Sequence, residues 1–311
     1  MTTTPTYDSM ESPAAREELF GGRLGQPLTR MDRVKRGLRQ FFVGKWLNVL
    51  GVAIIAVFLF LSLFGDALAP YNPLAPSIFD QLKGPSAVHI FGTDTLGRDI
   101  LSRVMSGAKI SLSVAAIVLS IAVTLGVLIG GISGYIGGKV DDVLMRLTDL
   151  FLAFPFLVLA IAISASLGPS LRNTVIALSV VYWPWYARLV RGQVLSIRHR
   201  EFVEAARSVG GSDARILARH VLPNAISPVI IQLTLDVGYA ILATSSLSFI
   251  GLGAQPPSPE WGSMINDARS HFQDAWWYIT FPGVALAITV LGFNLVGDGL
   301  RDFLDPRTRG R

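Results

Sequence analysis

The residues that could carry out chemistry in this sequence are few and scattered. The nearest approach to a phosphate-binding loop is residues 133–140 (SGYIGGKV). A P-loop would need glycine in place of Ser133 and serine or threonine in place of Val140. The four histidines do not show metal-ligand spacing: His89, His199, His220 and His271. No nucleophile elbow and no carboxylate pair suited to acid–base work is present. We therefore predict no catalytic residue, no cofactor site and no metal ligand in this chain.

One charged residue lies where a charge is costly. Asp236 is the only charged side chain well inside the apolar segments of the sequence, and Gln232, one helical turn earlier, shares its face. An isolated carboxylate at the centre of a membrane costs about 2.5–3.5 kcal/mol unless it is paired or faces water. Two interpretations stay open. In the first interpretation, Gln232 and Asp236 line a substrate pathway. In the second, they make a polar contact with a neighbouring helix.

The composition is that of a polytopic membrane protein. Hydrophobic residues make up 51% of the 311 residues, charged residues only 16%, and the mean hydropathy is +0.49. There is no cysteine, which excludes disulfides and thiolate metal sites. Six apolar segments are each close to the ~20 residues that a membrane-spanning helix needs: residues 46–64, 110–132, 149–167, 172–188, 224–250 and 279–298. We predict an all-α fold with six transmembrane helices.

The distribution of Lys and Arg predicts the orientation. Placing both termini inside leaves six of the 27 basic residues on the outer side: Lys83, Arg98, Arg103, Lys109, Arg172 and Arg269. The net charge of +5 is thus explained by topology rather than by nucleic acid. Residues 1–45 are predicted to be a cytoplasmic tail, whose basic stretch 30–45 forms a helix on the membrane lipid. Residues 305–311 are the second cytoplasmic tail.

Two proline-rich stretches are predicted to lie outside the membrane. Residues 46–107 comprise the first span and an outer segment in which residues 99–106 form a short helix lying flat. Residues 254–275 form the second outer stretch, with a short helix near residues 264–271. Residues 108–304 are the transmembrane core. Four glycines within it are predicted to line one helix face for close helix packing: Gly126, Gly130, Gly134 and Gly138.

Residues 201–223 (EFVEAARSVGGSDARILARHVLP) form a charged island between long apolar segments. Apolar residues recur at helical spacing in its first half, with charges opposite them. Gly210 is expected to end this first helix, and a second short helix follows and ends at Leu222-Pro223. Two short amphipathic helices held by membrane spans on both sides form a knob that is suited to enter a groove on another protein.

These residues also carry a family resemblance. Glu204-Ala205-Ala206, Gly210 and Leu222-Pro223 resemble the EAA loop of ABC importer permeases, with His220 where the motif usually has isoleucine. Further matching stretches occur in the expected order: FGTD at 91–94, LGRD at 96–99, LSFIGLG at 247–253, Trp261-Gly262, and NLVGDGLR at 294–301. Together they resemble the DppC/OppC-like family over about residues 40–307.

The resemblance implies the transmembrane fold of a type I ABC importer in the inner (plasma) membrane. Its expected partners are a second, DppB/OppB-like permease chain, two ATP-binding subunits that hold ATP and magnesium, and an extracytoplasmic substrate-binding protein. The chain itself is then a non-catalytic subunit that moves dipeptides or oligopeptides. The residues expected to couple it to the ATPase are Glu201, Glu204, Ala205, Ala206, Gly210, Leu222 and Pro223.

Several alternatives stay open. Within the same family the cargo could be nickel, glutathione or an oligosaccharide. An ion-driven secondary transporter would typically show internal repeats and several ionisable groups in the membrane, whereas this sequence shows one such group and no repeat. A scaffold or receptor that does not transport would have no need of the knob at residues 201–223.

Overall fold

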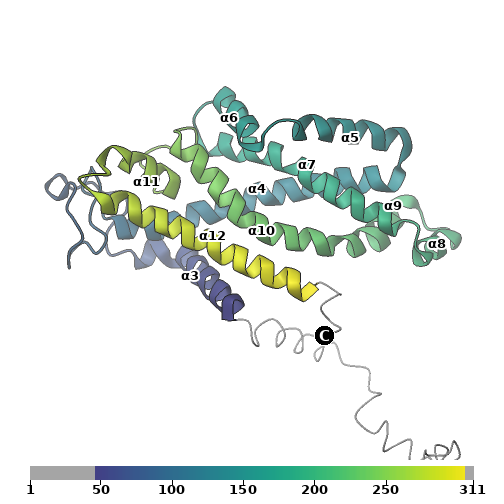
Figure 1. Cartoon of the computed structure of the whole chain (residues 1–311), viewed down its shortest axis with the longest axis horizontal. Coiled ribbons are helices and arrows are strands. Elements are labelled where there is room, and N and C mark those ends of the chain that lie inside the picture. The colour runs from purple at the N-terminus through teal and green to yellow at the C-terminus, as the bar shows by residue number, and fades with distance from the viewer. Residues whose placement is uncertain (1–45, 305–311) are drawn as a thin grey trace, which may run out of the picture. The chain divides into compact units, whose positions relative to one another are not determined.

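The computed structural model describes residues 46–304, which fold almost entirely into helices (Figure 1). The predicted interfacial helix at residues 30–45 and both predicted tails lie outside the described residues. In chain order the elements are α3 (Trp46–Leu68), η2 (Ile78–Asp80), α4 (Ile100–Ile136), α5 (Gly138–Leu152), α6 (Phe156–Leu167), α7 (Leu171–Ile197), α8 (Glu201–Ser208), α9 (Asp213–Ile216), η3 (Leu217–Val221), α10 (Leu222–Phe249), α11 (Trp261–Ala268), η4 (Arg269–His271) and α12 (Trp276–Leu304).

Four described helices are long and apolar enough to cross a membrane: α3, α4, the unbroken helix that joins α9, η3 and α10, and α12. The pair α5 and α6 would make a fifth span if the two helices cross together. The predicted all-helical membrane fold is therefore confirmed. The count of six and the orientation stay predictions, because α7, which occupies the predicted fourth span, is not among the helices that are apolar enough, and because the helices alone do not show which end is cytoplasmic.

The predicted third span, residues 149–167, is not one straight helix. Its first residues end α5, the rest form α6, and the two helices meet at 87°. The break lies at Ala153–Pro155, where the proline ring disfavours a helical conformation of the residue before it. The amphipathic α5 runs along α7, and ion pairs join them: Arg191 with Asp141 at 2.6 Å, and Arg188 with Asp149.

The short helix predicted at residues 99–106 is also not a separate element. These residues begin α4, which continues without a break for 37 residues. The helix begins here because the carboxylate of Asp99 accepts a hydrogen bond from the backbone N–H of Ser102 at 2.8 Å, capping the first turn. The short helix predicted near residues 264–271 is confirmed as α11 and η4.

Glycines allow α4 and α7 to pack backbone against backbone. A Cβ added at Gly126 would lie 2.3 Å from the Cβ of Tyr186, and one at Gly130 would lie 2.2 Å from the carbonyl oxygen of Ala187. Gly134 makes a similar approach to α7. The predicted packing face is thus confirmed for these three glycines and wrong for Gly138, because α4 ends at Ile136 and Gly138 begins α5.

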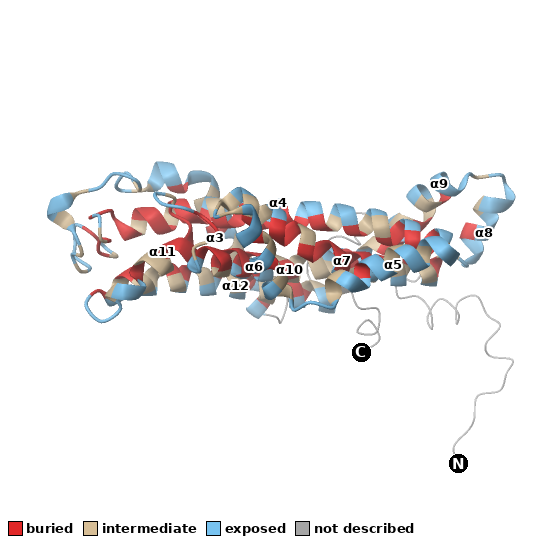
Figure 2. Cartoon of the chain, turned by 90° about the horizontal axis from the view of Figure 1, so that it is seen from above, coloured by how far each residue is buried: buried red, intermediate tan, exposed pale blue. Residues whose placement is uncertain are grey.

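The buried residues lie on the sides of α4, α7 and α10 that face one another, and the outward sides are exposed (Figure 2). In both views α8 and α9 lie together at one end of these helices, and α11 lies at the opposite end (Figure 1). The charged knob and the proline-rich outer stretches are therefore at opposite ends of the helices that connect them.

Candidate coupling loop and polar sites

The loop at residues 201–223 has the predicted break. Helix α8 ends before Gly210, which adopts a φ of +82°, a left-handed conformation that disfavours any side chain with a Cβ. Gly211 lies close to the end of α8, where an added Cβ would be 2.8 Å from the carbonyl oxygen of Ala206. Glycine is therefore favoured at both positions, for conformational freedom at Gly210 and for space at Gly211.

The predicted end of the second loop helix at Leu222-Pro223 is wrong. The helix that starts at Asp213 passes through the π-helical turn η3 and continues as α10 to Phe249. In η3 the N–H of Leu222 donates to the carbonyl of Leu217, five residues back. Pro223 lies in the first turn of α10, directly after this wider turn. The second half of the knob is thus continuous with α10, with no intervening loop.

Most residues predicted to couple to the ATPase lie on the surface of the knob. Glu201, Glu204, Ala205, Gly210 and Pro223 are exposed, whereas Ala206 and Leu222 are half-buried. The structure therefore brings the exposed members of this set to one end of the molecule. Their role as a contact for another protein stays a prediction.

The knob holds an apolar groove of about 530 Å³ between α8 and the helix that begins at α9. Val209, one of its lining residues, is 86% exposed. Basic side chains lie beside the apolar surface. The groove is lined by Phe202, Ala205, Ala206, Val209, Gly210, Gly211, Arg215, Ile216 and His220. Its lining combines apolar side chains with small residues, which leaves the groove open at the surface of the knob.

The knob is braced against the end of α4. The hydroxyl of Tyr135 donates to the carboxylate of Asp213 at 2.8 Å, and the guanidinium of Arg198 donates to the carbonyl of Gly134 at 2.9 Å. Val203 of α8 is fully buried. The sequence analysis missed Tyr135, Asp213 and Arg198 as parts of the loop's support, because these contacts join segments more than 60 residues apart.

Asp236 is buried, at 6% exposure, and both of its carboxylate oxygens have a donor. The hydroxyl of Tyr186, on α7, donates to Oδ2 at 2.6 Å. The side-chain amide of Gln232 donates to Oδ1 at 2.9 Å, which places Gln232 and Asp236 on one helix face as predicted. Of the two interpretations left open by the sequence, the polar contact with a neighbouring helix is present in the structure. A pathway role for Gln232 and Asp236 stays a prediction.

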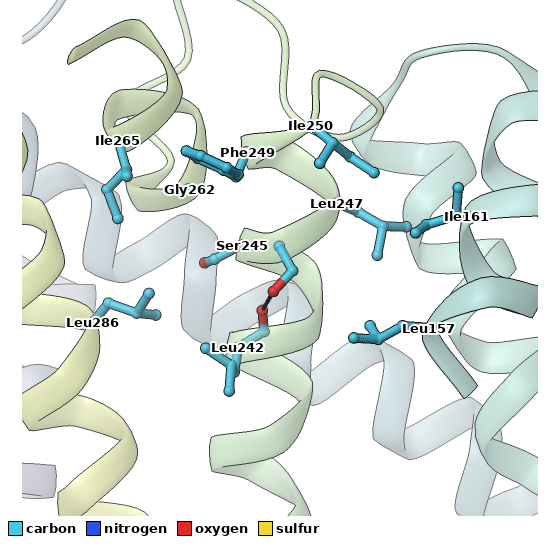
Figure 3. Close-up of a pocket in the computed structure, with 11 residues that line it drawn as sticks. Leu157, Ile161, Leu242, Ser245, Leu247, Phe249, Ile250, Gly262, Ile265 and Leu286 are labelled. Atoms are coloured by element: carbon cyan, nitrogen blue, oxygen red, sulfur yellow. Dashed lines mark hydrogen bonds between the residues drawn. The ribbon is translucent and has the colours of Figure 1, made fainter. Parts of the chain in front are cut away.

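A second groove, of about 360 Å³, lies near the other end of α10 (Figure 3). Leu157 and Ile161 of α6 approach α10 from one side, and Ile265 of α11 and Leu286 of α12 approach it from the other. The remaining lining residues belong to α10, to the residue that follows it and to α11: Leu242, Ser245, Ser246, Leu247, Phe249, Ile250 and Gly262. The hydroxyl of Ser246 is bonded to the carbonyl of Leu242, which leaves a largely apolar lining.

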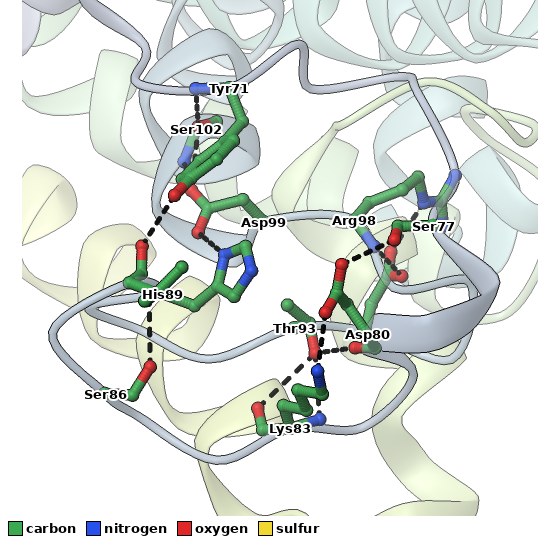
Figure 4. Close-up of polar contacts among 12 residues, drawn as sticks. Tyr71, Ser77, Asp80, Lys83, Ser86, His89, Thr93, Arg98, Asp99 and Ser102 are labelled. Carbon is green, nitrogen blue, oxygen red and sulfur yellow. Dashed lines mark hydrogen bonds and ion pairs between the residues drawn. The ribbon is translucent and has the colours of Figure 1, made fainter.

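The first outer stretch is folded by its own polar side chains (Figure 4). Buried Asp94 accepts from the backbone N–H groups of Leu96 and Arg98 at 2.9 Å and from the Arg98 guanidinium at 2.6 Å. His89 and Asp99 are bonded at 3.0 Å. On the exposed side, a hydrogen bond from Lys83 holds the pKa of Asp80 below its usual value. The FGTD and LGRD motifs thus build a rigid turn at this end of the molecule.

Two further contacts join the outer stretches to the helices. Arg103, in the first turn of α4, donates to the carbonyl of Pro73 at 2.9 Å and to that of Pro257 at 3.4 Å. The indole N–H of Trp261 donates to the carbonyl of Val104 at 3.0 Å. Buried Glu260 caps α11 through the N–H of Ser263. Both outer stretches are therefore fixed to the start of α4.

Within residues 46–304, no group of three or more His, Asp and Glu side chains could hold a metal ion. The expectation that the chain holds no cofactor stays a prediction.

Comparison with known proteins decides the family. The model of the family "binding-protein-dependent transport system inner membrane component" matches residues 126–310, which include the whole loop at 201–223. The chain belongs to this family. The resemblance to ABC importer permeases of the DppC/OppC type is thereby confirmed, and the chain is a multi-pass inner membrane protein.

Curated relatives align over nearly their whole length. A probable D,D-dipeptide transport system permease protein, DdpC from Escherichia coli, is 45% identical over 92% of this chain and 95% of the relative. A dipeptide transport system permease protein, DppC from Alkalihalophilus pseudofirmus, is 45% identical over 85% of this chain and 86% of the relative. A glutathione transport system permease protein, GsiD from Shigella flexneri, is 44% identical over 91% and 95%.

The fold resembles a solved membrane transporter. A chain from inward-facing structures of the MetNI methionine ABC transporter matches with a TM-score of 0.54 and 18% sequence identity. The match covers 65% of this chain and 97% of that chain. At this identity the likeness supports the transmembrane fold of an ABC importer and carries no information about cargo.

Proposed function

We propose that this chain is a permease subunit of an ATP-driven importer of dipeptides or oligopeptides, and that residues 201–223 couple it to separate ATPase subunits. One observation carries the proposal: the knob at these residues has an apolar groove and is continuous with α10. A loop that only joined two membrane spans would need neither feature. The relatives named above for dipeptide and glutathione transport support the peptide cargo.

The complex has four kinds of component. This chain and a second, homologous DppB/OppB-like permease each supply half of the pathway, and two ATP-binding subunits bind ATP and magnesium. An extracytoplasmic binding protein delivers the peptide to the end that carries the proline-rich stretches. The chain itself holds no cofactor and catalyses no reaction. Six spans with both termini in the cytoplasm place the knob beside the ATPase subunits and the outer stretches beside the binding protein.

The mechanism is a rigid-body motion driven from the knob. Helix α7 leads into the loop and α10 leaves it, so displacement of the knob moves both helices together. When ATP closes the ATPase dimer, the knobs of the two permease chains approach each other. The pathway then opens toward the binding protein. Hydrolysis separates the ATPase subunits and resets the helices.

The proposal is tested by reconstituting the four-component complex in vesicles. We expect ATP-dependent uptake of a labelled dipeptide that requires the binding protein and persists when ion gradients are collapsed. The isolated chain should hydrolyse no ATP. Glutathione, nickel and an oligosaccharide serve as competitors that separate the cargoes known to the wider family.

Two results would contradict it. Uptake that follows an ion gradient without ATP would identify a secondary transporter. ATP-driven uptake of nickel or an oligosaccharide with no peptide uptake would retain the ABC permease and overturn the cargo. Strong competition by glutathione, consistent with the relationship to GsiD, would narrow the cargo to that tripeptide class.

A further inference from the structure

We propose that the hydrogen bond between Tyr186 and Asp236 is a clip that makes α7 and α10 move as one body when the knob is displaced. Tyr186 and Asp236 are then positioning residues for coupling rather than contacts for cargo. The inference rests on the proposed function, because α7 and α10 are the helices on either side of the loop at residues 201–223.

The clip joins two buried side chains from separate helices. Tyr186 is fully buried and Asp236 nearly so, and the hydroxyl and carboxylate oxygens are 2.6 Å apart. Hydrogen bonds to a charged acceptor are shorter and stronger than those between neutral groups. Both side chains are buried within the protein, so breaking the bond would leave a buried carboxylate short of one donor. Sliding α10 along α7 is therefore unfavourable.

Packing locks each partner of the clip in place. The Cβ of Tyr186 lies against Gly126 of α4, where an added Cβ would be only 2.3 Å away. Gln232 holds the other oxygen of Asp236 from within α10. Leu222, at the start of α10, lies 3.1 Å from the position that a Cβ on Gly131 would take, so α10 also contacts α4 near the knob.

The bond between Tyr186 and Asp236 fixes the register of α7 and α10 more specifically than apolar contacts do. Between membrane helices there is no hydrophobic driving force, because lipid is as apolar as the partner helix, so association depends on packing and on interhelical hydrogen bonds. A single buried polar pair fixes the register of two helices, which is the best attested use of such pairs. This accounts for a carboxylate at position 236 without a cargo: both of its oxygens already accept from side chains of this chain.

Tyr186→Phe tests the clip, with Tyr182→Phe as a matched control. Tyr182 is also buried on α7, one turn earlier, and its hydroxyl is not bonded to Asp236. In the reconstituted complex we measure ATP hydrolysed per peptide transported. Hydrogen bonds between membrane helices contribute ~0.6 kcal/mol on average and ~1.7 kcal/mol at most, so the ratio should rise about threefold, and at most about eighteenfold, in Tyr186→Phe and stay unchanged in Tyr182→Phe.

A distance measurement reports on the clip without relying on the loop's function. The chain has no cysteine, and Trp185 on α7 and Tyr239 on α10 are exposed, so spin labels at Trp185→Cys and Tyr239→Cys report on these two helices. Partner subunits free of cysteine are used. We expect the same distance distribution without nucleotide and with ATP bound in the parent and in Tyr182→Phe. In Tyr186→Phe the distribution should broaden or shift when ATP binds.

Three results would overturn the clip. The first is a distance between the labels at positions 185 and 239 of the parent that changes when ATP binds. The second is that Tyr186→Phe matches Tyr182→Phe in both measurements, and the third is that Asp236→Asn alters the transport preference between Lys- and Glu-containing peptides while this distance stays constant. The last result would assign Asp236 to the pathway.

The loop variant Ala205→Trp separates the two proposals. If that variant is fully active, the proposal that residues 201–223 couple the chain to the ATPase is wrong. The distance measurement still decides whether Tyr186 and Asp236 hold α7 and α10 together.

Discussion

At the residue scale, a few side chains and glycines set the geometry of the loop and of its connection to the membrane helices. Gly210 could be predicted from the sequence, because a glycine after a short amphipathic helix commonly adopts the left-handed conformation that ends it. The shared face of Gln232 and Asp236 followed from helical spacing in the same way. Tyr186 and Tyr135 could not be identified, since their partners lie 50 and 78 residues away in the chain.

The conformation of Gly210 gives a prediction at this scale. Gly210→Ala introduces a Cβ at a φ of +82°, at a cost of about 1–2 kcal/mol, although no atom obstructs the added group. We expect the subunit to insert and transport per inserted complex to fall, because the end of α8 is displaced from the groove. Peptide uptake normalised to the amount of complex measures this.

Gly168 is the matched control for Gly210. It has a φ of +89° and equally open surroundings, but it lies in the turn between α6 and α7 at the other end of the helices. Gly168→Ala should show similar strain with normal transport per complex. Equal transport defects in both variants would show that strain alone, and not the position in the loop, is responsible.

At the element scale, the helices and their apolar faces were largely predictable, whereas their breaks and continuations were not. Hydropathy located every span that the structure shows as a long helix. It did not show that residues 149–167 bend at Pro155, nor that α10 continues through Pro223 into the loop. Both outcomes depend on whether neighbouring turns can accommodate a proline, which the local sequence does not specify.

The packing of α4 against α7 gives a prediction at the element scale. Gly130→Ala places a methyl group 2.2 Å from the carbonyl oxygen of Ala187, so the two backbones must separate. We expect a loss of about 1–3 kcal/mol of stability, measured as a lower melting temperature and less inserted protein. Gly192→Ala on α7 is the control, since no atom lies within 4 Å of the added group. A Gly130→Ala variant as stable as Gly192→Ala would contradict the close packing.

At the scale of the whole molecule, the two ends are built for different surroundings. One end carries the charged knob with its groove, and the other carries two stretches fixed to α4 by Arg103 and Trp261. The bias of Lys and Arg predicts which end is cytoplasmic, and the helical fold alone does not decide it. The sequence located both ends but not the groove, which forms only when α8 folds against the helix that begins at α9.

Orientation can be tested with single cysteines, because the chain has none of its own. Arg200 and Gln255 are both exposed. Arg200 directly precedes α8 and Gln255 lies between α10 and α11, and α8 and α11 are at opposite ends of the long helices (Figure 1). In intact cells an impermeant thiol reagent should label Gln255→Cys and leave Arg200→Cys unlabelled until the membrane is opened. Labelling of Arg200→Cys from outside would invert the proposed topology.

Binding of the ATPase subunits to the groove tests the central claim most directly. Ala205→Trp fills the groove with an indole, while Ala214→Trp adds the same side chain to an exposed position of α9 that does not line it. The measurement is the amount of ATP-binding subunit that copurifies with this chain, together with the ATPase activity stimulated by peptide-loaded binding protein. We predict that both fall at least about tenfold in Ala205→Trp, equivalent to ~1.4 kcal/mol of lost binding, and stay at the parent level in Ala214→Trp. Full copurification and full stimulation in Ala205→Trp would contradict the assignment of residues 201–223 as the coupling element.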